Sequence, residues 1–113
     1  MSKKYIIYSD GGSRGNPGPA AVCFVVDGKE YGESIGRTTN NVAEYSAVVF
    51  ALKKAKQLLT KAVAKKTDVE VRTDSELLVK QMNGEYKIKD EDLKPLFIEV
   101  WNLKQDFKSI TFT

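Results

Sequence analysis

A long helical pattern in the middle of the sequence separates two groups of strand-like segments. Asn40-Asn41 opens this pattern, and apolar residues then recur at helical spacing: Val42, Tyr45, Val48, Val49, Leu52, Ala55, Leu58, Leu59 and Ala62. The first half of the pattern is apolar nearly all round, which predicts a central, well-buried helix. Whatever fold the chain adopts must therefore pack around this helix.

Three strands are predicted before this helix. Residues 4–9 alternate and are rich in aromatic and β-branched types, and residues 20–26 and 29–36 form the second and third strands. Asp27-Gly28 is a two-residue hairpin signal. Four glycines and two prolines between Asp10 and Pro19 argue against regular structure there. The three strands should form an antiparallel meander.

The second half of the chain alternates strands and helices. Residues 68–73 predict a strand, residues 75–83 a helix ended by Gly84, residues 92–106 a helix, and residues 109–112 a last strand. The buried side of the third helix should carry Leu93, Leu96, Phe97, Val100, Trp101 and Leu103. Helices between strands favour parallel pairing. The order β-β-β-α-β-α-α-β predicts an α/β fold, a mixed sheet with helices on its faces, in one domain over residues 1–113.

Composition excludes several classes of enzyme and site. The chain has no histidine, and its single cysteine is Cys23, so serine–histidine triads, thiolate zinc sites and histidine-ligated haem are excluded. Catalysis would depend on carboxylates, lysines, hydroxyls or metals held by oxygen. No apolar run is long enough to cross a membrane, and Met1 to Lys4 leads directly into a strand rather than a signal peptide. We expect a cytoplasmic protein without membrane partners.

Six lysines and no acid lie between Lys53 and Lys66, although the formal net charge of the whole chain is only +3. They fit a solvated helix end, where cations lie near the negative pole of the helix dipole. They also fit a surface that faces nucleic acid. The sequence leaves both interpretations open.

Three acidic residues stand at the predicted element ends. Asp10 follows the first strand and precedes Gly11-Gly12, as turn residues do. Glu44 has capping-box spacing from Asn41, and Asp74-Ser75 is typical of a helix N-cap. Each acid therefore has a structural explanation when it is taken alone.

Taken together, the three acids predict a metal site. Parallel strands bring their carboxyl ends to one edge of the sheet, which would place Asp10 beside Asp74, and the buried helix can bring Glu44 to the same edge. Carboxylates in close proximity repel one another unless a cation neutralises them. Oxygen ligands favour Mg²⁺ or Mn²⁺, and such sites commonly carry out phosphoryl chemistry. The glycine-rich loop lacks the ending of a P-loop.

Three segments resemble the leading signatures of the ribonuclease H family, type 1, in the family's order and spacing. They are residues 8–18 (YSDGGSRGNPG), residues 39–44 (TNNVAE) and residues 72–77 (RTDSEL). The segment from Asn83 to Lys87 and the third helix resemble the compact bacterial and archaeal branch, which lacks the basic protrusion. The resemblance covers essentially the whole chain.

The resemblance implies a metal-dependent endonuclease that hydrolyses the RNA strand of RNA–DNA hybrids with two Mg²⁺ or Mn²⁺ ions. Asp10, Glu44 and Asp74 match the family's catalytic metal ligands. The substrate-binding positions that it implies are Gly11, Gly12, Ser13, Gly15, Asn16, Thr39, Asn40, Asn41 and Glu76. Among these, the serine and asparagine positions line the minor groove, where 2′-hydroxyls identify RNA. Thr39 matches a residue that holds a DNA phosphate, and Glu76 stands where the family often has glutamine.

The family pattern continues past the last strand to a helix with a fourth aspartate, whereas this sequence ends at Thr113. We therefore expect this 113-residue form to cleave poorly, to be marginally stable and to self-associate through its C-terminal edge. The alternative is a nucleic-acid-binding module of the same fold with little catalysis. A different nuclease or an integrase of the same superfamily is a third hypothesis, against which the asparagine pair and Gly15-Asn16-Pro17 argue.

Overall fold

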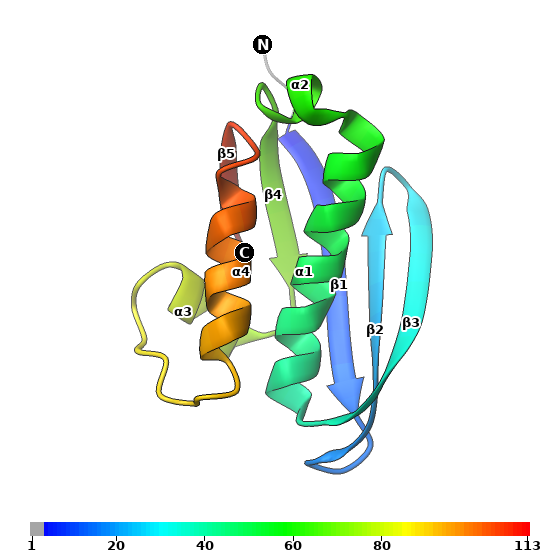
Figure 1. Ribbon diagram of the computed structural model, residues 1–113, viewed down its shortest axis with the longest axis vertical. Coiled ribbons are helices and arrows are strands. Elements are labelled where there is room, and N and C mark those ends of the chain that lie inside the picture. Colours follow the sequence, from blue (N-terminus) through cyan, green and yellow to red (C-terminus); the bar gives the residue numbers. More distant parts are fainter. Residues whose placement is uncertain (1–3) are drawn as a thin grey trace.

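The computed structural model describes residues 4–113, and in this range five strands form one mixed sheet (Figure 1). Met1–Lys3, on which part of the expectation about the N-terminus depends, lie outside the described residues. The strands are β1 (Lys4–Ser13), β2 (Gly18–Val26), β3 (Lys29–Thr38), β4 (Asp68–Thr73) and β5 (Ser109–Phe112), in the spatial order β3-β2-β1-β4-β5. Pairing is antiparallel from β1 to β3 and parallel from β1 through β4 to β5, which confirms the predicted mixed sheet.

β1 is longer than predicted and includes the first part of the glycine-rich segment. Asp10 pairs with Cys23 and Ser13 pairs with Ala20, so the expectation of irregular structure from Asp10 onward is wrong for Asp10–Ser13. The reason lies outside the segment, because the first turn of helix α1 (Asn40–Leu59) packs directly on this part of β1. A Cβ added at Gly11 would overlap the Ala43 carbonyl, so only glycine lets the helix come this close.

The central helix exists as predicted but ends earlier. α1 stops at Leu59, and Thr60 adopts a positive φ of 69° before the short helix α2 (Lys61–Ala64). The chain changes direction at this break. Leu58, just before the break, and Ala62, just after it, are exposed, whereas Ala64 is buried.

Two further helices follow β4. α3 (Glu76–Met82) ends before Gly84, whose φ of 80° is the left-handed conformation expected of a C-cap region. α4 (Lys94–Lys104) is shorter than the predicted helix at both ends, with Pro95 in its first turn. Trp101 is 48% exposed, so its assignment to the buried side is wrong. Helical spacing placed Trp101 beside the apolar face, but its ring stacks on Phe97 at the edge of the packed surface.

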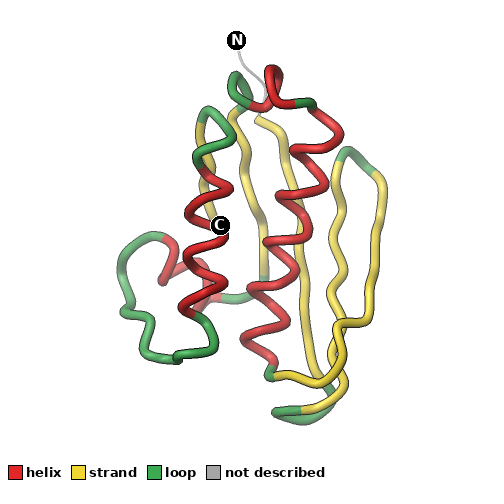
Figure 2. Tube along the Cα trace, viewed as in Figure 1, coloured by secondary structure: helices red, strands yellow, loops and turns green. Residues whose placement is uncertain are grey.

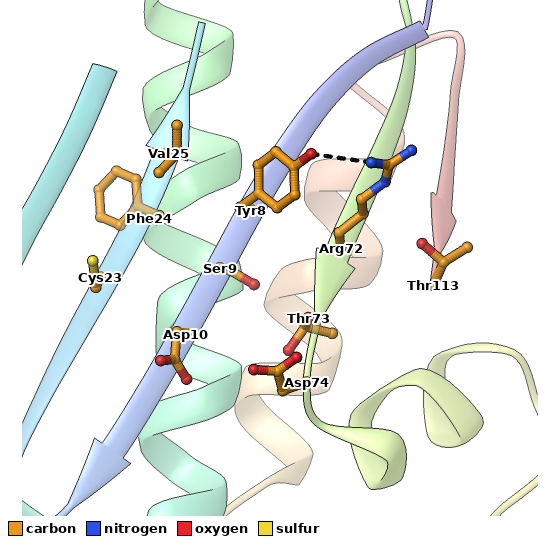
Figure 3. A pocket seen from close by; sticks show the side chains of 10 residues that line it. All are labelled: Tyr8, Ser9, Asp10, Cys23, Phe24, Val25, Arg72, Thr73, Asp74 and Thr113. Atoms are coloured by element: carbon orange, nitrogen blue, oxygen red, sulfur yellow. Dashed lines mark hydrogen bonds between the residues drawn. The ribbon is translucent and has the colours of Figure 1, made fainter. Parts of the chain in front are cut away.

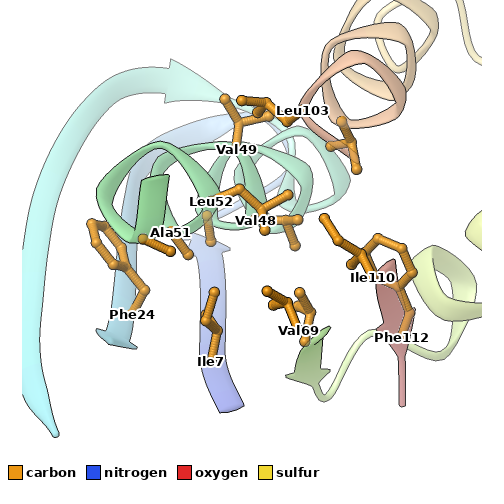
Figure 4. Packing of buried hydrophobic residues seen from close by; sticks show 14 of the residues in the cluster. Ile7, Phe24, Val48, Val49, Ala51, Leu52, Val69, Leu103, Ile110 and Phe112 are labelled. Atoms are coloured by element: carbon orange, nitrogen blue, oxygen red, sulfur yellow. The ribbon is translucent and has the colours of Figure 1, made fainter. Parts of the chain in front are cut away.

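α1 crosses the sheet along its length and α4 lies beside it on the same face (Figures 1 and 2). The core lies between these helices and the sheet, and Figure 4 shows Ile7 and Val69 of the sheet pointing toward Leu52 and Val48 of α1. The alternating burial of β1 and β2 explains this arrangement, because every second residue faces the helices. The other residues, such as Tyr8 and Cys23, point to the opposite, open face.

At the far end of α1, the lysines form ion pairs with α4 and the turn after it. Lys53 Nζ lies 2.8 Å from Glu99 Oε2, and Lys56 Nζ lies 3.0 Å from Asp106 Oδ2. Part of the lysine cluster therefore has a structural role. Within residues 4–113 the helices are too short or too polar to cross a bilayer.

Candidate active site

Asp10 and Asp74 line one cleft of about 390 Å³ on the open face of the sheet. Figure 3 shows the two carboxylates turned toward the space between β1 and the end of β4. The cleft is also lined by Tyr8, Ser9, Cys23, Phe24, Val25, Arg72, Thr73 and Thr113. Parallel pairing of Ser9 with Thr73 sets the two aspartates at equivalent positions in the two strands, as the sequence predicts.

The backbone around Asp74 leaves its side chain available to the cleft. Ser75, not Asp74, is the N-cap of α3, and its Oγ accepts the N–H of Leu78 at 3.1 Å. The Ser75 N–H is donated in turn to Thr73 Oγ1 at 3.2 Å. The cap therefore uses the neighbours of Asp74 and not its carboxylate.

Glu44 lies one turn into α1 and is not among the residues that line this cleft. The predicted capping box is wrong, because Thr39 is the N-cap and its Oγ1 accepts the N–H of Val42 at 3.3 Å. Glu44 Oε1 instead accepts a hydrogen bond from Asn40 Nδ2 at 3.3 Å. In residues 4–113, no three acidic or sulfur side chains stand close enough together to form a metal cluster as they lie. The structure thus brings two of the three predicted carboxylates into one cleft and keeps the third on the neighbouring helix.

The end of β1 and the loop that follows it carry several of the predicted substrate-binding residues and are hydrogen-bonded to α1. Ser13 donates its N–H to Asn40 Oδ1 at 3.2 Å, and Asn40 donates its own N–H to Asn16 Oδ1 at 3.0 Å. Ser13 Oγ donates to the Gly15 carbonyl at 2.5 Å, and Gly15 has a φ of 89°, which favours glycine. Gly12 lies beside the same junction, because a Cβ there would be 3.5 Å from Asn40 Oδ1. The loop is therefore held at the start of α1.

The remaining predicted site residues have different surroundings. Glu76 is 78% exposed, and its Oε1 lies 3.3 Å from Lys80 Nζ one helical turn away. The hydrogen bond that Lys80 donates to Glu76 and, after it, the hydrogen bond with Tyr86 raise the pKa of Lys80. Thr39 uses its hydroxyl in the helix cap, whereas Asn41 is half-buried in the first turn of α1.

Two groups of side-chain hydrogen bonds had no signal in the sequence. Buried Tyr45 donates its hydroxyl to Gln81 Oε1 at 2.6 Å, and Gln81 Nε2 donates to the Lys87 carbonyl at 3.2 Å. Burial raises the pKa of Tyr45 to about 12. On the open face, Arg72 bonds to Glu70 at 2.6 Å and to the Tyr8 hydroxyl at 3.0 Å, and its hydrogen bond lowers the pKa of Glu70. The Tyr45–Gln81 and Arg72–Tyr8 bonds join elements that are distant in sequence, so only the three-dimensional structure identifies them.

The chemistry of this edge of the sheet is that of oxygen donors. Two carboxylates face one open cleft, and the hydroxyl group of Thr73 lies beside them. Hard divalent cations prefer carboxylate and other oxygen ligands, so the donor set fits Mg²⁺ or Mn²⁺ better than a thiophilic metal. Next to the cleft, the loop and the start of α1 offer small polar groups suited to hydrogen bonding with a polar polymer.

Comparison with known proteins identifies the family to which the chain is similar. The RNase H family model matches residues 2–111. Ribonuclease HI of Halobacterium salinarum is 41% identical over 112 residues, which is 94% of this chain and 53% of that protein. Bifunctional protein Rv2228c of Mycobacterium tuberculosis is 40% identical over 116 residues, 96% of this chain and 30% of that protein. The chain thus spans about a third to a half of the length of these curated relatives.

A solved structure, LC11-RNase H1 in complex with an RNA/DNA hybrid, superposes with a TM-score of 0.90. It is 41% identical to this chain, and the match covers 97% of this chain and 83% of the other. The similarity therefore includes the sheet, α1 and the edge that carries Asp10 and Asp74.

Proposed function

The chain belongs to the ribonuclease H family, type 1, and from this premise we propose that it hydrolyses the RNA strand of RNA–DNA hybrids. The observation that carries the proposal is the pair of carboxylates, Asp10 and Asp74, that face one cleft beside a polar loop. The likeness to LC11-RNase H1, whose structure holds an RNA/DNA hybrid, supports the same substrate.

Asp10 and Asp74 would hold a divalent metal, Mg²⁺ or Mn²⁺, with Glu44 supplying a further ligand from α1. When bound, such a metal activates water and stabilises the leaving oxygen of a phosphodiester. The role of the chain is to keep the two aspartates in adjacent parallel strands, so that the same cleft receives the phosphate. The family as a whole uses divalent metals, and the proposed pair of ions remains our inference for this chain.

Selection of the RNA strand would depend on Ser13, Asn16, Asn40 and Asn41. These short polar groups lie at the end of β1, on the β1–β2 loop and in the first turn of α1, next to the carboxylate edge. A 2′-hydroxyl both donates and accepts hydrogen bonds, and its presence distinguishes RNA from DNA. Thr39 would stand next to these groups, at the position that the family uses for a DNA phosphate.

One observation favours the alternative of hybrid binding with little cleavage. Glu44 is hydrogen-bonded to Asn40 and lies outside the Asp10–Asp74 cleft. A site with only two carboxylates in place holds a metal more weakly than one with three. The alternative and the main proposal share the same substrate and differ only in turnover.

Hydrolysis of labelled RNA–DNA hybrid, duplex RNA and duplex DNA in Mg²⁺ and in Mn²⁺ tests the proposal directly. We expect cleavage of the hybrid alone, and we expect Asp10→Asn to reduce it by a factor of roughly 100 or more, because metal affinity and charge stabilisation are both lost. Asp92→Asn, the same change at an exposed position before α4, should leave the rate unchanged. The melting temperature of Asp10→Asn should equal or exceed that of the parent chain without metal, since one negative charge is removed from the cleft.

Two other outcomes would be informative. Tight binding of the hybrid without cleavage by the parent chain would favour the binding module. Equal binding to all three duplexes at one salt concentration would contradict the proposed substrate.

A further inference from the structure

Asn40 joins three parts of the site that are far apart in the sequence. Its main-chain N–H is donated to Asn16 Oδ1 at 3.0 Å, its Oδ1 accepts the Ser13 N–H at 3.2 Å, and its Nδ2 donates to Glu44 Oε1 at 3.3 Å. Ser13 is the last residue of β1 and Asn16 belongs to the loop that follows it, whereas Glu44 is one turn along α1. A single residue therefore connects the loop to a carboxylate of the site.

The orientation of the Asn40 amide is fixed by its two partners. Ser13 offers a donor, and the Glu44 carboxylate offers only acceptors. A rotation of the amide by half a turn would place two donors together on one side and two acceptors on the other. Each partner thus enforces the geometry of the other.

The amide group is also planar and rigid, so its oxygen and nitrogen move together. If Ser13 moves and Asn40 Oδ1 moves with it, Asn40 Nδ2 must shift as well. Nδ2 is the only side-chain donor that Glu44 has among residues 4–113. The Asn16 bond to the main chain of Asn40 adds a second connection between the loop and this residue. The position of Glu44 is therefore linked to the position of the loop.

We propose that Asn40 is a positioning residue that couples the end of β1 and the β1–β2 loop to the Glu44 carboxylate, so that contact of this segment with an RNA strand changes the position of Glu44. The inference rests on the proposed function for the identity of the strand, but the coupling itself is a property of the free protein. It assigns Asn40 a role beyond contact with the minor groove.

The first experiment uses the free protein at one pH without metal or nucleic acid. Amide hydrogen exchange reports the Ser13 N–H, and the ¹³C chemical shift of the Glu44 carboxylate reports its surroundings. Asn40→Ala should increase exchange at Ser13 by roughly tenfold, the worth of one hydrogen bond, and should shift the Glu44 signal. Asn40→Asp keeps an acceptor for Ser13 but repels Glu44, so exchange should stay low while the Glu44 signal shifts.

Coupling is measured with Asn16→Ala, which removes the bond to the Asn40 main chain. This variant should shift the Glu44 signal in the parent background and should shift it far less in the Asn40→Ala background. Asn41→Ala is the matched control, because no hydrogen bond joins the Asn41 side chain to the loop or to Glu44 in residues 4–113. It should leave the exchange rate of the Ser13 N–H and the ¹³C chemical shift of the Glu44 carboxylate unchanged.

The second experiment compares Asn40→Asp with Asn41→Asp in hybrid cleavage, because both add one negative charge to the same helical turn. KM should rise similarly in the two variants, whereas kcat should fall roughly tenfold further in Asn40→Asp. The coupling would be overturned if Asn16→Ala shifted the ¹³C signal of the Glu44 carboxylate equally in the parent and Asn40→Ala backgrounds. Unchanged exchange of the Ser13 N–H in Asn40→Ala would overturn it as well. Failure of the parent chain to bind or cleave the hybrid would instead overturn the proposed function, since the free-protein results decide the coupling independently.

Discussion

The two ends of α1 are held in place by different kinds of contact. At its start, the helix packs on Gly11 without space for a side chain, and polar bonds join it to the loop after β1. At its other end, exposed lysines pair with α4 and the turn that follows, and the helix breaks at Thr60. We call these the site end and the lysine end.

The difference predicts where the molecule tolerates change. Backbone packed without space for a side chain has little freedom to adjust, so a small displacement is costly. Exposed ion pairs are screened by water and salt, and each contributes little to stability. The site end should therefore be sensitive to single atoms, and the lysine end should not.

Gly11→Ala should have the largest effect. The added methyl group would overlap the Ala43 carbonyl and lie 2.7 Å from the Glu44 amide nitrogen, and both belong to the backbone of α1. Because the helix must move away from β1, we expect a loss of roughly 3 kcal/mol or more in the free energy of unfolding. Denaturant unfolding followed by circular dichroism measures it.

Gly32→Ala is the matched control in β3. Its added Cβ would meet the Val22 carbonyl at 3.8 Å, an ordinary contact, and the backbone there has no positive φ. The free energy of unfolding should change by less than about 1 kcal/mol. If the two variants were equally stable, the close approach of α1 to β1 would be refuted.

Tyr45→Phe should have the next largest effect at neutral pH. The change leaves the Gln81 Oε1 acceptor buried without its donor, which costs roughly 1–3 kcal/mol. The same variant should respond differently to alkaline pH. Burial raises the pKa of Tyr45 from its ordinary value of 10.0 to about 12, so the folded state holds this proton more tightly than the unfolded state.

The sign of the pH effect follows from this difference. Below pH 10 both states keep the proton and the contribution is complete, whereas from pH 10 to about 12 the unfolded state loses it first and stability falls. The stability difference between the parent chain and Tyr45→Phe should therefore shrink across this window. A difference that stays constant from pH 8 to pH 11 would argue against a buried, hydrogen-bonded phenol.

Much of the fold could be predicted because its signals are local. Asp27 and Gly28 form the expected hairpin turn, with φ values of 53° and 76°. The parallel pairing of β1 with β4 followed from the helix between them, and it places Asp10 and Asp74 at one cleft. The order of strands and helices along the chain was therefore enough to predict that Asp10 and Asp74 lie at the same edge of the sheet.

Most of the errors depend on contacts between segments or on which side of an element is covered. β1 continues through Gly11-Gly12 because α1 packs on it, and no local pattern indicates that contact. Capping-box spacing gave the wrong partner for Glu44, because α1 begins earlier than Asn41 with Thr39 as its N-cap, and Glu44 accepts from the Asn40 side chain instead. Helical spacing identified an apolar face for α4 but could not show that Trp101 lies at its uncovered edge.

Two buried serines, each next to one of the cleft aspartates in the sequence, test how much a hydrogen bond contributes to stability there. Ser9 and Ser75 are each 6% exposed, but Ser75 Oγ accepts the Leu78 N–H whereas Ser9 Oγ has no partner within residues 4–113. Ser75→Ala should cost roughly 1 kcal/mol through loss of the helix cap. Ser9→Ala should stabilise the protein by a similar amount, because it removes a desolvated hydroxyl. Destabilisation by both changes would indicate that Ser9 has a partner in solution.

Lys56→Ala should have the smallest effect, and it tests the lysine end directly. The Lys56–Asp106 ion pair is 3.0 Å long, but both side chains are partly exposed, so we expect a loss of no more than about 0.5 kcal/mol. In 1 M salt, where charges are screened within about 3 Å, that loss should vanish. Lys66→Ala is the control, since Lys66 is exposed and has no ion pair in the part of the chain that the structure describes. If Lys56→Ala cost more than about 1 kcal/mol and the cost persisted in high salt, the lysine stem would be contributing through packing on α4. The two ends of α1 would then be held by the same kind of contact, and the greater tolerance expected of the lysine end would not exist.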